Sequence, residues 1–526
     1  MKKRITLIFL ALMLITGLMP VTSFAADAKG VWTDYAAETF AGGTGTKDDP
    51  YLVETAEQLA KIAKDVNDGS DEYNGVCFKL TDNVDLSAHY WRPIGFILSS
   101  TNYKTFKGFI DGNNKIISGL TVDESAGKFP AGFFGKIGNS TTGETAGAKN
   151  LTISAADIYT SEEGCYYLYA GILAGYAQAN MEYQIVFENI RVSGNVEIAM
   201  TDGFSSAGGM FGYADRIQAT GCRAENISVE GSGNSGGFVG MTGGSVYENC
   251  LAAGIVDGAW GLGGFAGYTT SVIWEDASGQ SAFDHCSADV EIEGSDWRLG
   301  GFTGYAEYGI FENCVAYGNV DSTVGDFDPK AGGFFGESSD VEAERCHAAG
   351  GVTVAASEYK AGGFVGAYTG GTYSACSFDS EKNSGLNAAG TGTLASGVTG
   401  EDGALVLANI CADYYGGHQY SSELTVDKQP TCTEDGSQSY HCERCGDKKD
   451  SQVIPAIDHD WSEPQWNWSS DCSSAVATFT CQNDNTHQET PQVTLTSKVI
   501  REATCTADGE KIKSLFKISV AGVIVE

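Results

Sequence analysis

The sequence predicts a mainly β protein in which a solenoid of short, similar coils fills the middle of the chain. A Gly-Gly pair recurs along this part, and in five of six copies a cysteine follows the second glycine after 13 residues. An offset kept so often indicates a structural period. The five copies run from Gly209, Gly237, Gly301, Gly333 and Gly363 to Cys222, Cys250, Cys314, Cys346 and Cys376, and a sixth, Gly264 to Cys286, has an offset of 22.

Apolar residues at alternate positions accompany each cysteine and predict a strand with one face turned inward. Leucine and isoleucine hold the cysteine position in the earliest copies, so we interpret the array cysteines as small core residues with free thiols. This position contains Leu120, Leu151, Ile190, Cys222, Cys250, Cys286, Cys314, Cys346 and Cys376.

Residues 1–25 have the features of a secretory signal peptide. Lys2, Lys3 and Arg4 precede an apolar run, and Ala25 is the expected cleavage position. No later apolar stretch is long enough to span a membrane, so we expect a secreted protein that is released or associates with the cell surface.

The net charge of −36, from 32 basic and 68 acidic residues, disfavours nucleic acid as a partner.

Residues 26–119 are expected to form an N-terminal cap and the first coils. Leu59, Ile62, Ala63 and Val66 have helical spacing, and a capping box at Thr55 predicts a short amphipathic helix from there to about Val66. Short strands separated by Asp-Gly and Asn-Asn turns follow this helix.

Residues 120–420 are expected to form the repeat array, with two or three short strands in each coil. Coils that stack about 4.8 Å apart place equivalent side chains in ladders. The residue after each ladder position is also mostly apolar, so the sequence leaves open whether this strand is covered on both faces or exposed on one. The predicted ladder contains Phe133, Ile172, Met210, Phe238, Phe265, Phe302, Phe334 and Phe364.

The last hundred residues contain six of the 15 cysteines, and we expect two small β-rich Cys/His modules there, 421–462 and 463–526, the second resembling a truncated copy. Cys-Glu-Arg-Cys-Gly has the form of a zinc knuckle, and structural zinc in these modules is the only cofactor expected. Disulfides are the alternative in an exported chain. The first predicted ligand set is Cys432, Cys442, Cys445 and His459, and the second, with wider spacing, is Cys472, Cys481, His487 and Cys505.

An aromatic residue precedes the Gly-Gly pair in several coils. If exposed, these residues form a stripe of flat apolar faces suited to sugar rings or a partner protein. If packed on neighbouring loops, they only seal a corner. The candidate ligand-binding residues are Phe204, Trp260, Trp297, Phe327 and Tyr359.

Two copies of the repeat, 236–254 and 301–318, resemble the core phrases of bacterial surface proteins with GLUG-type repeats. Residues 91–95 and 106–112 resemble the opening block of that family, and the tail resembles a Cys/His-rich module of the same proteins. Over about residues 40–420 the resemblance implies a right-handed parallel β-helix on an exported protein.

The sequence lacks the catalytic motifs of two enzyme classes that have similar repeats or a similar fold. Immunoglobulin-cleaving zinc peptidases with similar repeats need His-Glu-x-x-His, which does not occur here, and the phrases of polygalacturonases are also absent. The nearest cluster of acidic and basic residues, Asp326, Asp328 and Lys330, is interpreted as a solvated loop.

We therefore expect a secreted or cell-surface β-helix protein that serves adhesion or recognition without catalysis. Its expected partner is an extracellular glycan or a host or bacterial surface protein. The alternative is a β-helical carbohydrate-active enzyme, a polysaccharide lyase or hydrolase, with an unrecognised site.

Overall fold

The computed structural model describes residues 30–525, except for 71–72, 100, 125–129, 162–166, 181–184, 201–203, 272–278, 296, 324–328, 356–359, 395, 472, 492, 494, 516–517 and 521–522. The predicted signal peptide, 1–25, lies outside the described residues. Contacts between residues divide the chain into two units, Met1–Tyr414 and Tyr415–Glu526.

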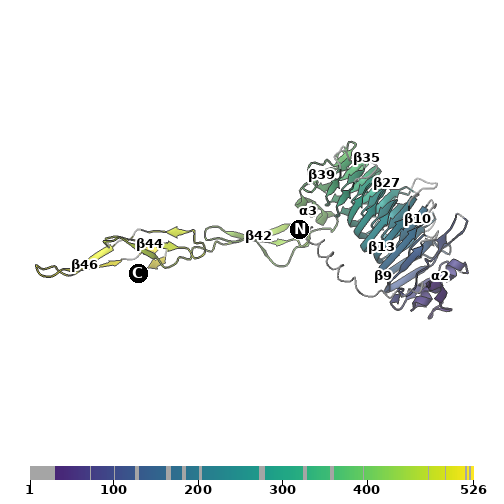
Figure 1. Ribbon diagram of the computed structural model, residues 1–526, viewed down its shortest axis with the longest axis horizontal. Helices are drawn as coiled ribbons and strands as arrows, with labels where there is room; N and C mark the ends of the chain where they lie inside the picture. Colours follow the sequence, from purple (N-terminus) through teal and green to yellow (C-terminus); the bar gives the residue numbers. More distant parts are fainter. Residues whose placement is uncertain are drawn as a thin grey trace, which may run out of the picture. The chain divides into compact units, whose positions relative to one another are not determined.

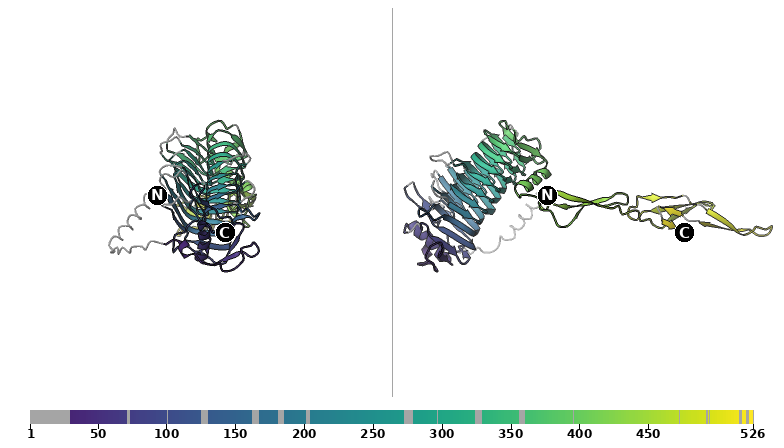
Figure 2. Two further views of the ribbon diagram at one scale, coloured as in Figure 1. Left: turned by 90° about the vertical axis from the view of Figure 1, so that its right-hand side faces the viewer. Right: turned by 180° about the vertical axis from the view of Figure 1, so that it is seen from behind.

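The first unit is a parallel β-helix whose coils stack on one another (Figures 1 and 2). One complete coil runs through β14 (Phe204–Gly208), β15 (Phe211–Asp215), β16 (Ile217–Thr220) and β17 (Arg223–Gly231). Each strand pairs in parallel with its equivalent in the next coil. The predicted mainly β solenoid is confirmed, but a coil contains up to four strands because it bends at more points than the two or three expected strands allow.

The strands fall into four rows of equivalents. The first row is β10 (Tyr167–Gly171), β14, β18 (Asn234–Gly236), β22 (Gly261–Gly263), β26 (Arg298–Gly300), β30 (Lys330–Gly332) and β34 (Lys360–Gly362). The second is β8 (Phe134–Gly138), β11 (Ala174–Gln178), β15, β19 (Val239–Gly243), β23 (Ala266–Thr270), β27 (Thr303–Glu312), β31 (Phe335–Glu344), β35 (Val365–Tyr368) and β38 (Ala389–Thr391). The third is β12 (Ile185–Glu188), β16, β20 (Val246–Glu248), β24 (Ala282–Asp284) and β36 (Gly371–Ser374), continued by the second halves of β27 and β31. The fourth is β9 (Ala146–Ser161), which also extends into the third row, β13 (Arg191–Ala199), β17, β21 (Leu251–Gly258), β25 (Ser287–Gly294), β28 (Val315–Ala316), β29 (Val320–Ser322), β32 (His347–Ala348), β33 (Val352–Val354), β37 (Cys376–Asp379) and β39 (Val398–Glu401).

The glycines of the repeat are required by close backbone contacts at the bend between the first two rows. A Cβ atom on Gly236 would lie 2.1 Å from the carbonyl oxygen of Val239, and one on Gly237 would lie 2.2 Å from that of Gly264. A Cβ atom on Gly240 would lie 2.7 Å from the backbone nitrogen of Ala207. These distances are shorter than any normal carbon contact, so only glycine fits at the three positions.

The predicted ladder is buried and forms a stack of phenylalanine rings. Successive ring centroids from Phe238 through Phe265 to Phe302 lie 4.6 and 5.1 Å apart with nearly parallel planes. The residue after each ring is buried too, Val239 being an example, because the chain bends at this pair. Both residues of this pair are therefore covered, which answers the question that the sequence left open about Phe238 and Val239.

A left-handed residue followed by a cysteine forms the bend between the third and fourth rows. Asn249 has a φ of 54°, a conformation that asparagine tolerates better than most residues. The thiol of the next residue, Cys250, donates to the carbonyl oxygens of Ala219 and Glu248, both at 3.4 Å. The other array cysteines make the same contacts and are free thiols.

A helix covers the first coils. The predicted helix is α2 (Ala56–Asp68), and the Thr55 side chain accepts from the backbone N–H of Gln58 as its cap. Its apolar face is buried, and it ends at Gly69, which has a φ of 73°. The remaining elements here are η2 (Trp32–Tyr35), β1 (Tyr51–Val53), β2 (Cys77–Leu80), β3 (Val84–Asp85), β4 (Phe96–Ile97), β5 (Tyr103–Lys104), β6 (Phe109–Ser118) and β7 (Thr121–Glu124).

A second helix, α3 (Gly403–Asp413), follows the last coils and was not predicted. Val406 and Ile410 of this helix pack on Val315 and Ala349 of the β-helix. The side chain of Asp402 caps the helix by accepting from the backbone N–H of Leu405 at 2.9 Å.

The second unit consists of small antiparallel sheets. β40 (Thr425–Lys428), β41 (Gly436–His441) and β42 (Lys448–Ile454) form the first sheet. β43 (Gln465–Trp468), β44 (Ala475–Thr480) and β45 (Gln488–Glu489) form the second. Two hairpins follow, β46 (Leu495–Arg501) with β47 (Glu510–Leu515) and β48 (Ile518–Val520) with β49 (Val523–Val525).

Replacing Phe265 with alanine should lower the free energy of unfolding by about 3–5 kcal/mol, because the ring is fully buried between two others and leaves a cavity. Chemical denaturation followed by circular dichroism measures the change. Phe204→Ala is the matched control, since that ring is 54% exposed and should cost little. Equal losses in the two variants would contradict a stabilising ladder.

Candidate functional site

Aromatic side chains gather outside the Gly-Gly bend, on neighbouring strands of the first two rows. The strand register places Tyr167 beside Phe204 in the first row and Tyr176 beside Tyr213 in the second. Together with Tyr169 of the first row and Trp260, which directly precedes β22, they form what we call the aromatic corner. Its members are Tyr167, Tyr169, Tyr176, Phe204, Tyr213 and Trp260.

The rings of the two rows meet across the bend. Tyr176 and Tyr213 are stacked with centroids 4.8 Å apart, and the Tyr169 ring lies 5.2 Å from the first and 5.5 Å from the second. This approach depends on glycine, because a Cβ atom on Gly212 would lie 2.6 Å from the backbone nitrogen of Ala170. The same close contact that forms the bend therefore brings the tyrosines together.

A pocket of about 370 Å³ lies in the aromatic corner and is lined by uncharged residues. Tyr167 and Phe204 form exposed walls, with 61% and 54% of their surface accessible. Burial raises the pKa of Tyr169, Tyr176 and Tyr213, so their hydroxyl groups stay neutral. Flat apolar faces combined with neutral hydroxyls suit the two faces and the hydroxyl edge of a sugar ring.

A polar network behind the pocket fixes one of these tyrosines. The Tyr176 hydroxyl donates to Oε1 of Gln178 at 3.0 Å, and Nε2 of Gln178 donates to Oδ2 of Asp215 at 3.0 Å. Burial raises the pKa of Asp215, although the hydrogen bond from Gln178 and the charge of Arg216 act in the opposite direction.

The aromatic surface continues along the first row. The edge of Trp260 meets the Phe204 ring at 6.0 Å, and Trp260 stacks on Trp297 at 5.4 Å with planes 2° apart. The Arg298 guanidinium lies 4.2 Å from the centroid of the Tyr305 ring. The structure thus brings together three predicted residues, Phe204, Trp260 and Trp297, whereas Phe327 and Tyr359 lie outside the described residues.

The tyrosines of the second row were missed by sequence reasoning. Their signal is visible in the sequence, because a tyrosine follows the third glycine of the repeat at Tyr176, Tyr213, Tyr268 and Tyr305. The pattern was overlooked because alternation along one strand does not show which outward residues meet a neighbouring strand across a bend.

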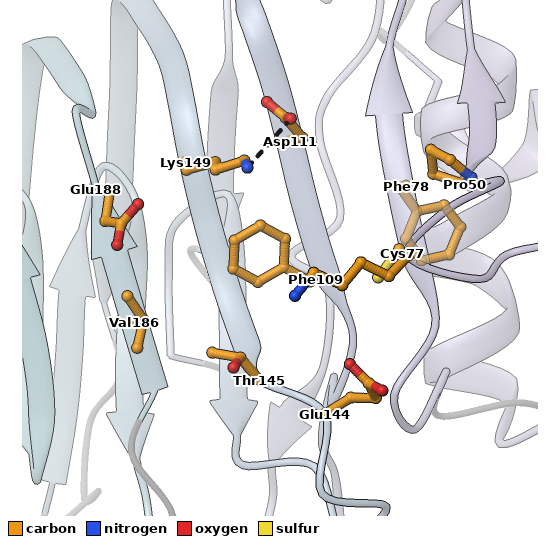
Figure 3. A pocket seen from close by; sticks show the side chains of 11 residues that line it. Pro50, Cys77, Phe78, Phe109, Asp111, Glu144, Thr145, Lys149, Val186 and Glu188 are labelled. Carbon is orange, nitrogen blue, oxygen red and sulfur yellow. Dashed lines mark ion pairs between the residues drawn. The ribbon is translucent and has the colours of Figure 1, made fainter.

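A second pocket, of about 290 Å³, lies on the first coils (Figure 3). The Phe109 ring lies in its middle, with Asp111 and Lys149 beyond it as an ion pair at 3.6 Å and Glu144 on the opposite side. Burial, together with the nearby Glu144 carboxylate, raises the pKa of the Cys77 thiol, which is therefore a poor nucleophile. This pocket combines carboxylates and lysines, as acid–base chemistry requires.

Of the cluster considered in the sequence, Lys330 pairs with Glu337 at 2.9 Å, while Asp326 and Asp328 lie outside the described residues.

The second unit contains a cysteine–histidine group placed to hold a metal ion. The ligand atoms of His418, Cys442 and Cys445 lie within 4.8 Å of one another, and His418 Nδ1 is 3.3 Å from Cys445 Sγ. Burial alone would raise the pKa of the Cys442 thiol, but hydrogen bonds from the backbone of Cys445 and Arg444 and from His418 lower it to about 6. A thiol with this pKa is largely a thiolate at neutral pH, the form that binds metals.

A further group in the same unit consists of Cys432, His459 and His487, whose ligand atoms also lie within 4.8 Å of one another. Cys481 Sγ lies 3.6 Å from Cys432 Sγ. Cys505 is exposed, and Cys472 lies outside the described residues.

The predicted ligand sets are therefore regrouped. The first set, Cys432, Cys442, Cys445 and His459, is divided between two groups, and His487 joins residues of the first set. His418 was missed because the search for a histidine went downstream from the knuckle. Instead, Tyr420 forms an isolated antiparallel bridge with Cys442, and this bridge brings His418 from upstream.

Comparison with known proteins gives partial matches. No family model matches this chain. The chain is 34% identical over 145 residues to a "Putative Gly-rich membrane protein" of Evansella cellulosilytica. This match covers 26% of the chain and 14% of the relative. The chain is also 29% identical over 178 residues to Halomucin of Haloquadratum walsbyi. That match covers 33% of the chain and 2% of the relative. The chain thus spans a small part of both relatives.

The chain is also similar to the crystal structure of a "putative immunoglobulin A1 protease" from Bacteroides ovatus, with 18% sequence identity and a TM-score of 0.34. The match covers 73% of this chain and 93% of the other chain. Within the part of the chain that the structure describes, no helix has the length and apolar character needed to cross a membrane.

Proposed function

We propose that this protein is exported to the cell surface, where it binds an uncharged glycan in the aromatic corner without altering it chemically, in adhesion or recognition. The observation that carries the proposal is the pocket lined by stacked and exposed rings with neutral hydroxyls. An acidic glycan is a poor ligand, because the net charge of −36 repels it.

Export and surface location have support from the sequence. Residues 1–25 resemble a signal peptide, and the repeats resemble those of GLUG-type surface proteins. The similarity to a protein described as a Gly-rich membrane protein is in keeping with a place at the cell envelope.

The variant Tyr167→Ala/Phe204→Ala/Trp260→Ala should bind neutral glycans roughly tenfold or more weakly than the wild type, since it removes the exposed stacking faces. A glycan array identifies the ligand, and titration calorimetry measures the affinities. Ile255→Ala is the matched control, because it removes an apolar side chain that is 50% exposed on β21, away from the corner. Unchanged affinity in the triple variant would refute the aromatic corner as the binding site, and selective binding to a surface protein would replace the glycan as partner.

The second candidate function is a β-helical carbohydrate-active enzyme, favoured by the carboxylates and lysines around Phe109. Such an enzyme should release reducing ends or unsaturated products from polysaccharides. Glu188 is a further carboxylate that lines this pocket, and Asp111→Asn with Glu188→Gln should reduce the release at least about 100-fold. Chromatography of products after incubation with neutral and acidic polysaccharides measures this. Absence of products leaves binding alone, as the leading proposal expects.

We also propose that the cysteine–histidine groups of the second unit bind zinc. Thiolates and imidazoles in groups of this size are the usual ligands of structural zinc. Metal analysis of the purified full-length chain should find zinc at about one ion or more per chain, and Cys442→Ser with Cys445→Ser should lower the content by about one. Less than one zinc per chain in the wild type would contradict the proposal.

A further inference from the structure

We infer that Cys481 joins Cys432, His459 and His487 in a single four-ligand zinc centre that fastens the two sheets of the second unit to each other. The inference rests on the zinc proposal for the identity of the metal. It adds the fourth ligand and the mechanical role of the site.

The ligands come from both parts of the unit. Cys432 lies between β40 and β41 of the first sheet, and His459 follows β42 of the same sheet. Cys481 follows β44 of the second sheet directly, and His487 directly precedes β45. The first sheet thus provides Cys432, the segment between the two sheets provides His459, and the second sheet provides Cys481 and His487.

The distance between the two sulfur atoms fits a tetrahedral zinc site. Zinc lies about 2.3 Å from sulfur and about 2.0 Å from nitrogen, so tetrahedral ligand atoms are separated by roughly 3.3–3.8 Å. The two sulfur atoms are 3.6 Å apart. The ligand atoms of Cys432, His459 and His487 lie within 4.8 Å of one another, a spacing that a small inward movement closes around an ion.

Two buried ring nitrogens at this place need a partner. Nδ1 of His459 and Nδ1 of His487 are buried and have no hydrogen-bond partner among the described residues. The other nitrogen of His487, Nε2, lies 3.7 Å from Oδ2 of Asp484, as in metal sites where a carboxylate orients the ligating imidazole. A Cys432–Cys481 disulfide would use the two sulfurs but leave both nitrogens unsatisfied, at a cost of about 1–3 kcal/mol each.

The backbone around the centre repeats that of the first metal group. Trp461 bridges to Cys481 as Tyr420 bridges to Cys442. The backbone N–H of Ser462 donates to the carbonyl oxygen of Thr480 at 2.9 Å. In the first group, the backbone N–H of Ser421 donates to the carbonyl oxygen of His441, also at 2.9 Å. His459 is thus the counterpart of His418, and Cys481 is the counterpart of Cys442. This equivalence independently assigns a ligand role to Cys481.

No buried apolar cluster among the residues described in this unit joins its two sheets. Among its described residues, the buried apolar cluster consists of Ala477 and Phe479, with three partly buried neighbours, all beyond the first sheet. Cys432 and Cys481 are buried nonetheless, at 5% and 0% exposure. Small folds with so little core commonly rely on a metal ion, whose binding energy becomes folding energy.

The test compares full-length variants by zinc analysis and by hydrogen exchange of the β44 amides. Cys432→Ser and Cys481→Ser should each lose about one zinc per chain. Cys432→Ser, although it lies in the first sheet, should also speed exchange in β44 of the second sheet roughly tenfold or more. Cys442→Ser with Cys445→Ser is the matched control, which should lose the other zinc and leave β44 exchange unchanged. Cys505→Ser, at an exposed cysteine, should change neither quantity.

Full zinc content in Cys481→Ser would overturn the fourth ligand. Zinc loss in Cys432→Ser with unchanged β44 exchange would overturn the fastening role. A Cys432–Cys481 disulfide, detected by mass spectrometry of the alkylated, unreduced wild type, would overturn the centre while leaving zinc at the first group intact. Wild-type protein without any zinc would refute the underlying zinc proposal together with this inference.

Discussion

The backbone contact at the Gly-Gly bend is the constraint on which the first unit depends. Glycine at Gly236, Gly237 and Gly240 lets two strand rows touch at the level of the main chain, where any side chain would collide with a carbonyl oxygen or an amide nitrogen. This contact turns Phe238 inward onto its ladder. In the earlier coils, the same contact turns Tyr169 and Tyr176 outward against each other. One steric requirement therefore produces both the core and the candidate binding surface.

The β-helix was predictable because its repeat leaves two independent marks, the fixed offset from glycine to cysteine and the buried phenylalanine positions. Helix α2 was predictable from the spacing of Leu59 and Val66 and from its cap at Thr55. Helix α3 was not, since its apolar residues surround the helix and leave no periodic face. Leu405, for example, is 46% exposed while Val406 is buried. The tyrosines of the aromatic corner were missed because their contacts cross a bend whose sharpness no single-strand pattern encodes.

The second unit shows a different limit of sequence reasoning. The residue types indicated cysteine–histidine groups placed to hold a metal ion, but the spacing along the chain did not indicate which residues share a group. Antiparallel pairing brings His418 from upstream to Cys442, and the approach of the two sheets brings Cys432 to Cys481. Few buried apolar residues accompany these contacts, so no hydrophobic pattern in the sequence predicts them.

The stacking of equivalent coils also determines how this protein can change over evolution. Each coil contacts only its neighbours, so duplication or deletion of one copy of the gene segment preserves every glycine contact and every ring stack on either side. The outer surface then grows or shrinks in steps of one strand spacing, roughly 4.8 Å, without any redesign of the interior. The number of coils alone thus determines how long the outer surface is and how many contacts it makes with an extended polymer.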